Sequence, residues 1–329
     1  MVVLQMGHHE MAESLEDNAM NNIFITGLWR SGTSLLLRLF DSHPQIFAMP
    51  IETGIVGVLE KDPEYLDKLK NCQSSYQLLS LISSNPVFRF QDIIRGAISG
   101  LSFSRTKDHY PFDFDFELFA TSFFEVLRDH SSLNKIVYGY YESIQKAWIS
   151  QKGADEKSTF AIQRAHRIEK YPGEDSVRFL MQNVDSMVVF ELIRDPVFQI
   201  ESALRNDPGL TLAQAVVSWA YSYDVVKQRS RAYPEMYKAI RYEDLVEDTS
   251  STMRQLVDLV GIEWNEVLTK PTFSSHNWKP NSDINTNSGI RRRYKTNLST
   301  QQLKYIQNSL HHHRSELSYP TISDIITIN

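Results

Sequence analysis

Short apolar runs alternate with amphipathic segments along this chain. Residues 23–26, Ile-Phe-Ile-Thr, are β-branched or aromatic and predict a strand, and residues 34–40 follow with apolar side chains at helical spacing. Gly27 ends the first run and opens a glycine-bearing loop, so the order is strand, loop, helix. The helix is expected to end before Pro44, because proline disfavours helical geometry in the residue that precedes it.

A second unit repeats this order later in the chain. Residues 187–193 form a nearly continuous apolar run, which is typical of a strand buried on both faces of a parallel sheet. Residues 212–226 are amphipathic at helical period, and residues 237–242 predict another strand. Residues 253–260 carry apolar side chains at i, i+3, i+4 and i+7, and Gly261 is placed to end that helix.

This alternation predicts an α/β fold with a central, mainly parallel sheet. Residues 60–135 interrupt the pattern, because they are helical or irregular and rich in Phe and Tyr. We interpret them as an insertion that shapes a pocket rather than as a separate domain. The expected organisation is a flexible N-terminus over residues 1–22 and a single domain over residues 23–329.

The amino-acid composition limits which binding partners and which cellular compartment the protein can have. The 329 residues contain 34 Lys and Arg against 40 Asp and Glu, a formal net charge of −6, so the global field argues against nucleic acid as a partner. Any anion must therefore bind locally. Cys72 is the single cysteine, which excludes an intrachain disulfide and a cysteine-rich zinc site and fits a reducing compartment. Since no apolar window approaches roughly 18 residues and residues 1–22 do not form a signal peptide, we expect no transmembrane segment and a cytoplasmic location.

The loop after the first strand carries the candidate chemistry. Residues 27–34 read Gly-Leu-Trp-Arg-Ser-Gly-Thr-Ser, at a junction where backbone amides and the helix dipole bind anions. Nucleotide-hydrolase phosphate loops share the Gly-x-x-x-x-Gly spacing but continue with lysine, where Thr33 stands here, and the cation is Arg30. A single 5′-phosphate with an attached group therefore fits better than a nucleoside triphosphate. A glycine turn that only caps the helix is the structural alternative.

Several motifs, in order, resemble a known family. Residues 24–44, FITGLWRSGTSLLLRLFDSHP, look like the 5′-phosphosulfate loop of sulfotransferases, in the Arg-Ser-Gly-Thr form of the tyrosylprotein and carbohydrate branches. Residues 188–205, VVFELIRDPVFQIESALR, resemble the family's 3′-phosphate motif. Residues 240–246, IRYEDLV, match its Arg-Tyr-Glu-Asp-Leu segment, and residues 288–302 are similar to its late basic stretch.

The resemblance implies a P-loop-NTPase-like three-layer fold and 3′-phosphoadenosine 5′-phosphosulfate as the sulfuryl donor. It implies a hydroxyl acceptor, which is a carbohydrate, a lipid, a small molecule or a peptide tyrosine. The residues it assigns to donor binding are Arg30, Ser31, Gly32, Thr33, Ser34, Arg194, Ser202, Tyr242, Arg291 and Arg292.

The positions of Arg194 and Ser202 also fit phosphate binding on physical grounds. Arg194 ends a predicted parallel strand, at the crevice where α/β sheets bind ligands, and its guanidinium can grip a phosphate; an ion pair with Asp195 is the alternative. Ser202 on the next helix adds a hydroxyl donor, and Arg205 one turn later either shares the ligand or faces solvent. Tyr242 either contacts the nucleotide or belongs to the core.

The basic run at residues 291–295 also has two alternative interpretations. It either closes over the 3′-phosphate or an acidic acceptor, or is a solvated face. Trp29 either stacks on adenine or covers the site.

Glu52 is the candidate general base, because an attacking hydroxyl must lose its proton. It resembles the catalytic glutamate of the tyrosylprotein branch, which lies in a Glu-Thr pair at a similar distance from the loop. That branch carries arginine after the threonine, where this chain has Gly54, and the departure weakens the case for a peptidyl-tyrosine acceptor. His43 is the rival base, and we interpret it as structural because it precedes a helix-ending proline. A solvated Glu52 without a role is the other alternative.

The leaving group is an anion, so its departure requires cations from the protein. Arg30 and Lys170 are the candidates, and with Glu52 they complete the predicted catalytic set. Lys170 resembles the family's lysine in a Lys-x-Pro context, and an ordinary surface lysine is the alternative. We expect no metal, because a sulfuryl group carries less charge than a γ-phosphoryl group and the chain has no zinc or EF-hand motif. The run His311–His313 is interpreted as a solvated helix end.

Two other functions remain as alternatives. A P-loop small-molecule kinase is disfavoured by Thr33 at the lysine position, and a catalytically inactive nucleotide-binding protein would keep the anion loop without turnover. The aromatic segment at residues 103–116 either lines an apolar acceptor pocket or forms a strand with one buried face.

Overall fold

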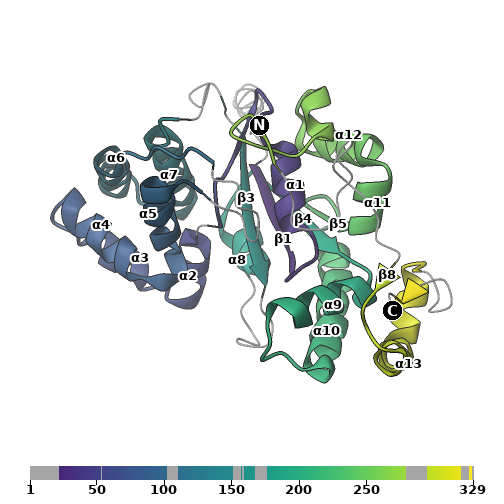
Figure 1. The fold of residues 1–329 in the computed structure, drawn as a ribbon. Coiled ribbons are helices and arrows are strands. Elements are labelled where there is room, and N and C mark those ends of the chain that lie inside the picture. Colours follow the sequence, from purple (N-terminus) through teal and green to yellow (C-terminus); the bar gives the residue numbers. More distant parts are fainter. Residues whose placement is uncertain are drawn as a thin grey trace, which may run out of the picture.

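A five-stranded, wholly parallel sheet lies at the centre of the fold in the computed structural model (Figure 1). The structure describes residues 22–52, 54–101, 110–150, 157, 159–166, 176–278, 295–319 and 326–327. The strands are β1 (Asn22–Leu28), β2 (Ile46–Ala48), β3 (Thr159–His166), β4 (Met187–Ile193) and β5 (Tyr237–Arg241). Their order across the sheet is β2-β3-β1-β4-β5, so the two strands with the most continuous apolar runs, β1 and β4, lie side by side in its centre.

The predicted α/β class is confirmed, and most predicted elements agree with the structure to within a few residues. All seven residues of β1 and all seven of β4 are buried, as a sheet covered on both faces requires. The helix after the loop is α1 (Thr33–Phe40), and its Phe40 ring stacks on Phe190 of β4 with 6.1 Å between ring centroids. Gly261 ends α12 (Thr249–Val260) with a left-handed φ of 78°.

Helices between β2 and β3 form the layer on one side of the sheet (Figure 1). They are α2 (Ile55–Lys61), α3 (Tyr65–Lys70), α4 (Ser75–Ser84), the short 3₁₀ helix η2 (Pro86–Phe88), α5 (Phe90–Ser99), α6 (Phe116–Asp129) and α7 (Leu133–Ala147). The described part of the aromatic segment belongs to the core of this layer. Phe112 and Phe114 are buried and stacked at 5.7 Å, while Asp113 between them is exposed. A helix starts at Phe116, so the alternation covers only one short extended stretch.

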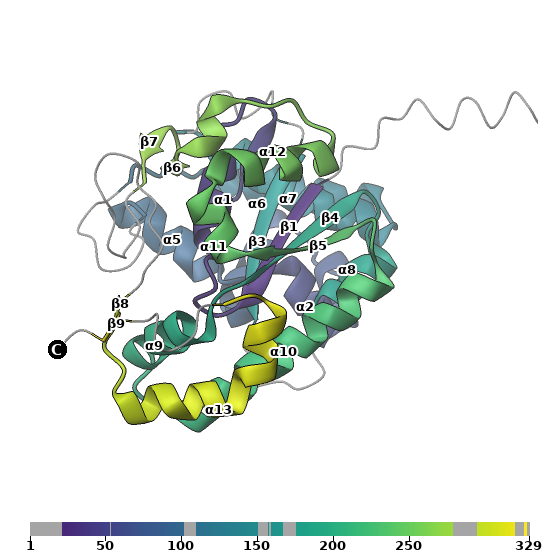
Figure 2. The same ribbon diagram turned by 90° about the vertical axis from the view of Figure 1, so that its right-hand side faces the viewer.

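The remaining helices follow β3, β4 and β5. They are α8 (Ser176–Asn183), α9 (Pro196–Asn206), α10 (Leu212–Ala232), α11 (Tyr242–Glu247), α12, the 3₁₀ helix η4 (Glu266–Thr269) and α13 (Thr300–Glu316). Two small sheets pair β6 (Thr272–Phe273) with β7 (His276–Asn277) and β8 (Lys295–Thr296) with β9 (Ile326–Thr327). Helices α1, α11 and α12 cover the face of the central sheet opposite to the α2–α7 layer, and α13 crosses next to α9 and α10 (Figure 2).

No helix within the described ranges is long and apolar enough to cross a membrane. The single-domain organisation and the pocket-shaping role of residues 60–135 stay predictions.

Candidate functional site

The loop between β1 and α1 is built to expose backbone groups at a helix start. Gly32 is the N-cap residue of α1 and adopts φ 108°, ψ 12°, a left-handed conformation that glycine reaches without a Cβ clash. Because a glycine N-cap has no side chain, no side-chain hydrogen bond caps the first turn. Arg30, two residues earlier, also has a positive φ of 65°. Two left-handed residues in one short loop turn it sharply at the carboxyl end of β1, where an anion-binding helix start is expected.

Tyr242 lies directly against this loop. A Cβ built on Gly32 would lie 2.4 Å from Cδ2 of the Tyr242 ring, so only glycine permits the contact. Tyr242 opens α11 after β5 and is buried, and burial raises the pKa of its hydroxyl. The two interpretations of Tyr242 as core and as nucleotide contact are therefore compatible, since its buried ring forms one wall of the anion loop.

The predicted cations and hydroxyl converge on the same loop. Arg30 Nε donates to Ser202 Oγ on α9 at 3.0 Å. Arg194 Nη1, at the end of β4, donates to the carbonyl oxygen of Arg30 at 3.2 Å. The guanidinium carbon of Arg194 also lies 4.4 Å from the centroid of the Tyr242 ring, within cation–π range. Residues from three separate motifs, at 24–44, 188–205 and 240–246, thus meet at one place.

Two buried polar atoms in this cluster have no hydrogen-bond partner among the described residues. They are Ser31 Oγ in the loop and Nε of Arg194. A buried polar group without a partner costs free energy, so these two atoms are candidates for contacts with a bound ligand. The donor set, which consists of two guanidinium groups, two hydroxyls and a helix start, fits a phosphate-bearing ligand.

Two residues that brace this loop were not predicted from the sequence. Gln199 of α9 is 1% exposed, and its Nε2 donates to the carbonyl oxygen of Trp29 at 2.9 Å. Trp219 of α10 donates its indole N–H to Gln199 Oε1 at 3.1 Å and to the carbonyl oxygen of Arg194 at 3.0 Å. One amide and one indole therefore fix the loop and the end of β4 relative to each other. The contacts span 20 to 170 residues along the chain, and no local pattern marks them.

Two acidic residues lie buried behind Arg194. Asp195 caps α9, with Oδ1 accepting from the Val197 amide at 2.9 Å, and its backbone N–H donates to Glu243 Oε1 at 3.0 Å. Burial, together with the charge of Asp195, raises the pKa of Glu243 to about 6. Arg314 of α13 lies 3.5 Å from Asp195 Oδ2, so the last long helix contributes a buried cation next to the site. Asp195, the alternative ion-pair partner considered for Arg194, therefore lies within ion-pair distance of Arg314.

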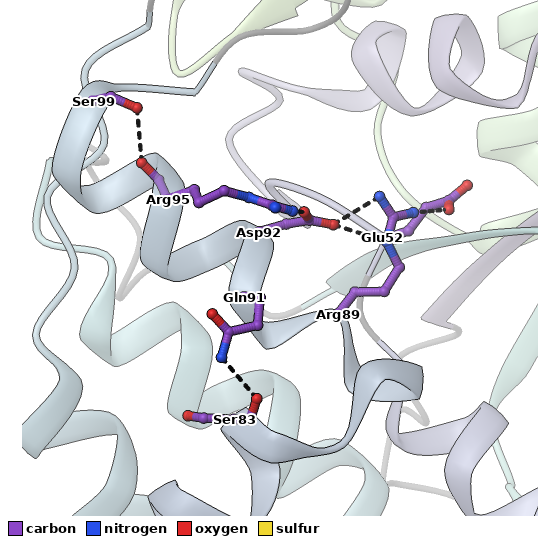
Figure 3. A network of polar contacts seen from close by, with 7 residues as sticks. All are labelled: Glu52, Ser83, Arg89, Gln91, Asp92, Arg95 and Ser99. Carbon is purple, nitrogen blue, oxygen red and sulfur yellow. Dashed lines mark hydrogen bonds and ion pairs between the residues drawn. The ribbon is translucent and has the colours of Figure 1, made fainter. Parts of the chain in front are cut away.

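Glu52 lies in the segment that follows β2, and two arginines hold this segment. Its carboxylate forms an ion pair with Arg89, which stands between η2 and α5 (Figure 3). The buried Arg38 of α1 donates through Nη2 to the carbonyl oxygens of Met49 and Pro50 at 2.9 and 3.1 Å. Glu52 is thus neither fully solvated nor loosely placed, since its side chain is 26% exposed.

His43 takes a structural position. It is 1% exposed, its Nδ1 accepts from the Gln45 amide at 3.2 Å, and its Nε2 lies 3.0 Å from the carbonyl oxygen of Glu263. If Nδ1 accepts, Nε2 carries the proton and donates, so both ring nitrogens are engaged with the backbone. Burial lowers the pKa of the ring, which favours its neutral form. These contacts support Glu52 over His43 as the candidate base.

Other predicted residues can be placed only in part. Thr33 is buried in the first turn of α1 and Ser34 is exposed there, while Arg205 is exposed in the last turn of α9. Lys170, Arg291 and Arg292 lie outside the described residues, and their roles stay predictions.

The three histidines of the run at residues 311–313 differ in their exposure. His311 and His312 are exposed on α13, whereas His313 packs edge-on against Tyr223 at 5.6 Å between ring centroids. No three His, Cys, Asp or Glu side chains gather as a metal site among the residues with assigned positions, and the metal-free site stays a prediction.

The fold and the site together define an α/β protein with a glycine loop and two arginines at the first strand–helix junction. The sequence profile of the sulfotransferase family matches residues 22–266, which is most of the chain. The chain belongs to this family, whose members are transferases, and the resemblance to sulfotransferases is confirmed. Its assignment to the tyrosylprotein and carbohydrate branches stays a prediction.

Solved structures of other sulfotransferases are similar to this chain over nearly its whole length. The sulfotransferase domain from the curacin biosynthetic pathway is 18% identical, with a TM-score of 0.44 and coverage of 92% of this chain and 98% of that one. STF9 from Mycobacterium avium is 14% identical, with a TM-score of 0.44 and coverage of 95% and 80%. A sulfotransferase from Alicyclobacillus acidocaldarius is 14% identical, with a TM-score of 0.42 and coverage of 92% and 98%. These likenesses are distant, and family membership rests on the sequence match. None of the curated proteins compared with the chain matches it.

Proposed function

We propose that the protein transfers a sulfuryl group from 3′-phosphoadenosine 5′-phosphosulfate to a hydroxyl acceptor. The observation that carries this proposal is the convergence of Arg30, Arg194 and Ser202 on the glycine loop at Gly32. Such a set of donors suits a ligand with more than one phosphate group, and sulfotransferase membership supports this particular donor.

The donor-binding residues divide by position. The loop residues Ser31 to Ser34 would hold the 5′ end at the start of α1, where the helix dipole favours an anion. Arg194 and Ser202 would hold the 3′-phosphate, with Arg291 and Arg292 as further cations. Arg30 contacts Ser202, so it would lie between the 5′ and 3′ phosphate groups of the bound donor.

Each catalytic residue has one task in this proposal. When bound, the donor supplies the sulfuryl group. Glu52 would accept the proton of the acceptor hydroxyl as its oxygen attacks sulfur. Arg30 and Lys170 would offset the negative charge that grows on the phosphate oxygen as its bond to sulfur breaks, so that adenosine 3′,5′-bisphosphate leaves. The acceptor is a carbohydrate, a lipid, a small molecule or a peptide tyrosine, and a cytoplasmic location is part of the proposal.

Thermal unfolding with two ligands tests the donor. A ligand that binds only the folded protein raises its melting temperature, so adenosine 3′,5′-bisphosphate should raise it more than ATP at the same concentration. Arg194→Ala should abolish most of this shift, whereas Arg231→Ala, an exposed cation on α10, should leave it intact. A larger shift with ATP would favour the kinase alternative and overturn the proposal.

Turnover tests the catalytic roles. Incubation of acceptor pools with isotopically labelled donor should give a labelled product. Glu52→Gln and Lys170→Ala should each lower kcat by about 100-fold with little change in donor affinity, because general-base and leaving-group assistance act in the transition state. A binding protein without turnover would give no product with any pool.

A further inference from the structure

We propose that Arg89 is a positioning residue for Glu52, and this inference rests on the proposed function. Arg89 belongs to the helical insertion and lies 37 residues from Glu52 along the chain. Its guanidinium nevertheless contacts the Glu52 carboxylate directly through Nη1. The insertion would then do more than border the acceptor site, since it would orient the base that deprotonates the acceptor.

The guanidinium is held on its other edge. Arg89 Nε and Nη2 both bond to Asp92 Oδ2, at 2.9 and 2.8 Å, so one edge of the planar group is fixed to the first turn of α5. Figure 3 shows Arg89 between Asp92 and Glu52. Because the guanidinium is planar and rigid, fixing this edge aims Nη1 at Glu52. Asp92 in turn also pairs with Arg95, one turn further along α5.

The backbone brings the two segments together. Gly54, two residues after Glu52, packs on η2 so closely that a Cβ would lie 2.3 Å from the carbonyl oxygen of Val87. Arg89 itself has φ 54°, a left-handed conformation that turns the chain between η2 and α5. Close packing on one side and a tight turn on the other place the guanidinium next to the carboxylate.

This contact also accounts for a departure noted in the sequence. The tyrosylprotein branch carries an arginine where this chain has Gly54, and the packing against Val87 leaves no space for a side chain there without a shift of η2. Positive charge next to Glu52 comes instead from Arg89, through space. The cation is thus present at the base, although the sequence position suggested that it was missing.

Holding the carboxylate should matter for the rate more than for donor binding. A base must lie within hydrogen-bond reach of the hydroxyl it deprotonates, and small misplacements cost large factors in rate. Arg89 is contributed by a different part of the fold from the donor cluster around Gly32. Its loss should therefore lower kcat and leave the KM for the donor nearly unchanged.

The experiment compares Arg89→Met with Arg95→Met. Both variants remove a guanidinium that pairs with Asp92, but only Arg89 also contacts Glu52. We expect Arg89→Met to lower kcat by about tenfold or more, with donor KM within about twofold of the wild-type value. Arg95→Met should behave as wild type, and Arg89→Lys should recover part of the loss, because it restores the charge without the planar fork.

A double-mutant cycle separates positioning from general damage. If Arg89 acts through Glu52, adding Arg89→Met to Glu52→Gln should cause no further loss of kcat. Losses that multiply, or equal kcat values for Arg89→Met and Arg95→Met in an active enzyme, would overturn the assignment of Arg89. A wild-type protein that binds adenosine 3′,5′-bisphosphate but moves no sulfuryl group would overturn the proposed function instead.

Discussion

Gly32 carries two constraints at once. Its φ of 108° belongs to a region that other residues rarely adopt, and its missing side chain lets the Tyr242 ring close on the loop. Backbone strain and a steric clash would therefore add if any side chain were introduced. The clash would displace the Tyr242 ring or the loop, so both ligand affinity and the free energy of unfolding should decrease.

We expect Gly32→Ala to weaken the binding of adenosine 3′,5′-bisphosphate by about tenfold or more and to lower the free energy of unfolding by about 1–3 kcal/mol. Titration calorimetry and chemical denaturation measure these two effects. Gly261→Ala is the matched control, because Gly261 also has a positive φ, 78°, but has no atom within 4 Å of the added Cβ. It should lose about 1–2 kcal/mol of stability from backbone strain and bind the ligand normally. Equal ligand affinity of the two variants would contradict the role given to Gly32.

Helix α1 and the segment after β2 are tied by the buried side chain of Arg38. It is 2% exposed, and Nη2 bridges the carbonyl oxygens of Met49 and Pro50. Burial lowers the pKa of Arg38 to about 10, but the group stays charged at neutral pH. One helix therefore carries the anion loop at its start and supports the segment of Glu52 near its end.

Replacing Arg38 by Met should lower the free energy of unfolding by about 3–5 kcal/mol, because it removes a buried charged donor and leaves two carbonyl oxygens without it. Urea or guanidinium denaturation measures the change. Arg128→Met provides a control, since this arginine is exposed at the end of α6 and lies over Phe124 at 5.2 Å. A loss below about 1 kcal/mol for Arg38→Met would show that the bridge is not needed.

The elements that were predicted from the sequence are each marked by a pattern within a few consecutive residues, such as an apolar run or a glycine that ends a helix. The apolar run at residues 187–193 has the same bounds as β4, and the glycine after the helical pattern ends α12. Strands β2 and β3 were not predicted. β2 has only three residues, and the apolar run in β3 is short before Gln163, so neither stretch stands out from its neighbours.

The site residues also divide into those that a local motif marks and those that it does not. Loop residues and Arg194 were predicted because their chemistry and position follow a strand within one motif. Arg89, Gln199 and Arg314 were not, because each acts on a partner far away in sequence. Only the packing of helices around the sheet decides which distant side chain reaches the loop.

Three distant parts of the chain meet in a buried acidic cluster next to Arg194. Asp195 follows β4, Glu243 belongs to α11, and Arg314 comes from α13. Two carboxyl groups and one guanidinium are thus removed from water together. Because burial and Asp195 raise the pKa of Glu243 from 4.5 to about 6, the folded protein binds this proton more tightly than the unfolded chain does.

The sign of the pH effect follows from this difference. Protonated Glu243 stabilises the fold fully below about pH 4.5, and this contribution is lost as the pH rises through about 6, a change of about 2 kcal/mol. In Glu243→Gln the titration is absent, while the amide oxygen can still accept from the Asp195 N–H. The free energy of unfolding of this variant relative to wild type should therefore rise by about 2 kcal/mol between about pH 4 and about pH 8.

Denaturation at several pH values measures this difference. Glu247→Gln, an exposed substitution on the same helix, is the matched control. A difference between Glu243→Gln and wild type that does not change with pH would refute the assignment.

The buried guanidinium of Arg314 has a practical consequence for anyone choosing fragment boundaries. The family profile ends at residue 266, yet α13 lies beyond it and supplies this cation to Asp195 next to Arg194. Thr296, also beyond the boundary, donates to Glu201 Oε2 at 2.8 Å, one residue before Ser202. A recombinant fragment cut where the family match ends would therefore keep every strand of the central sheet and still lose side chains that complete the interior around the candidate site.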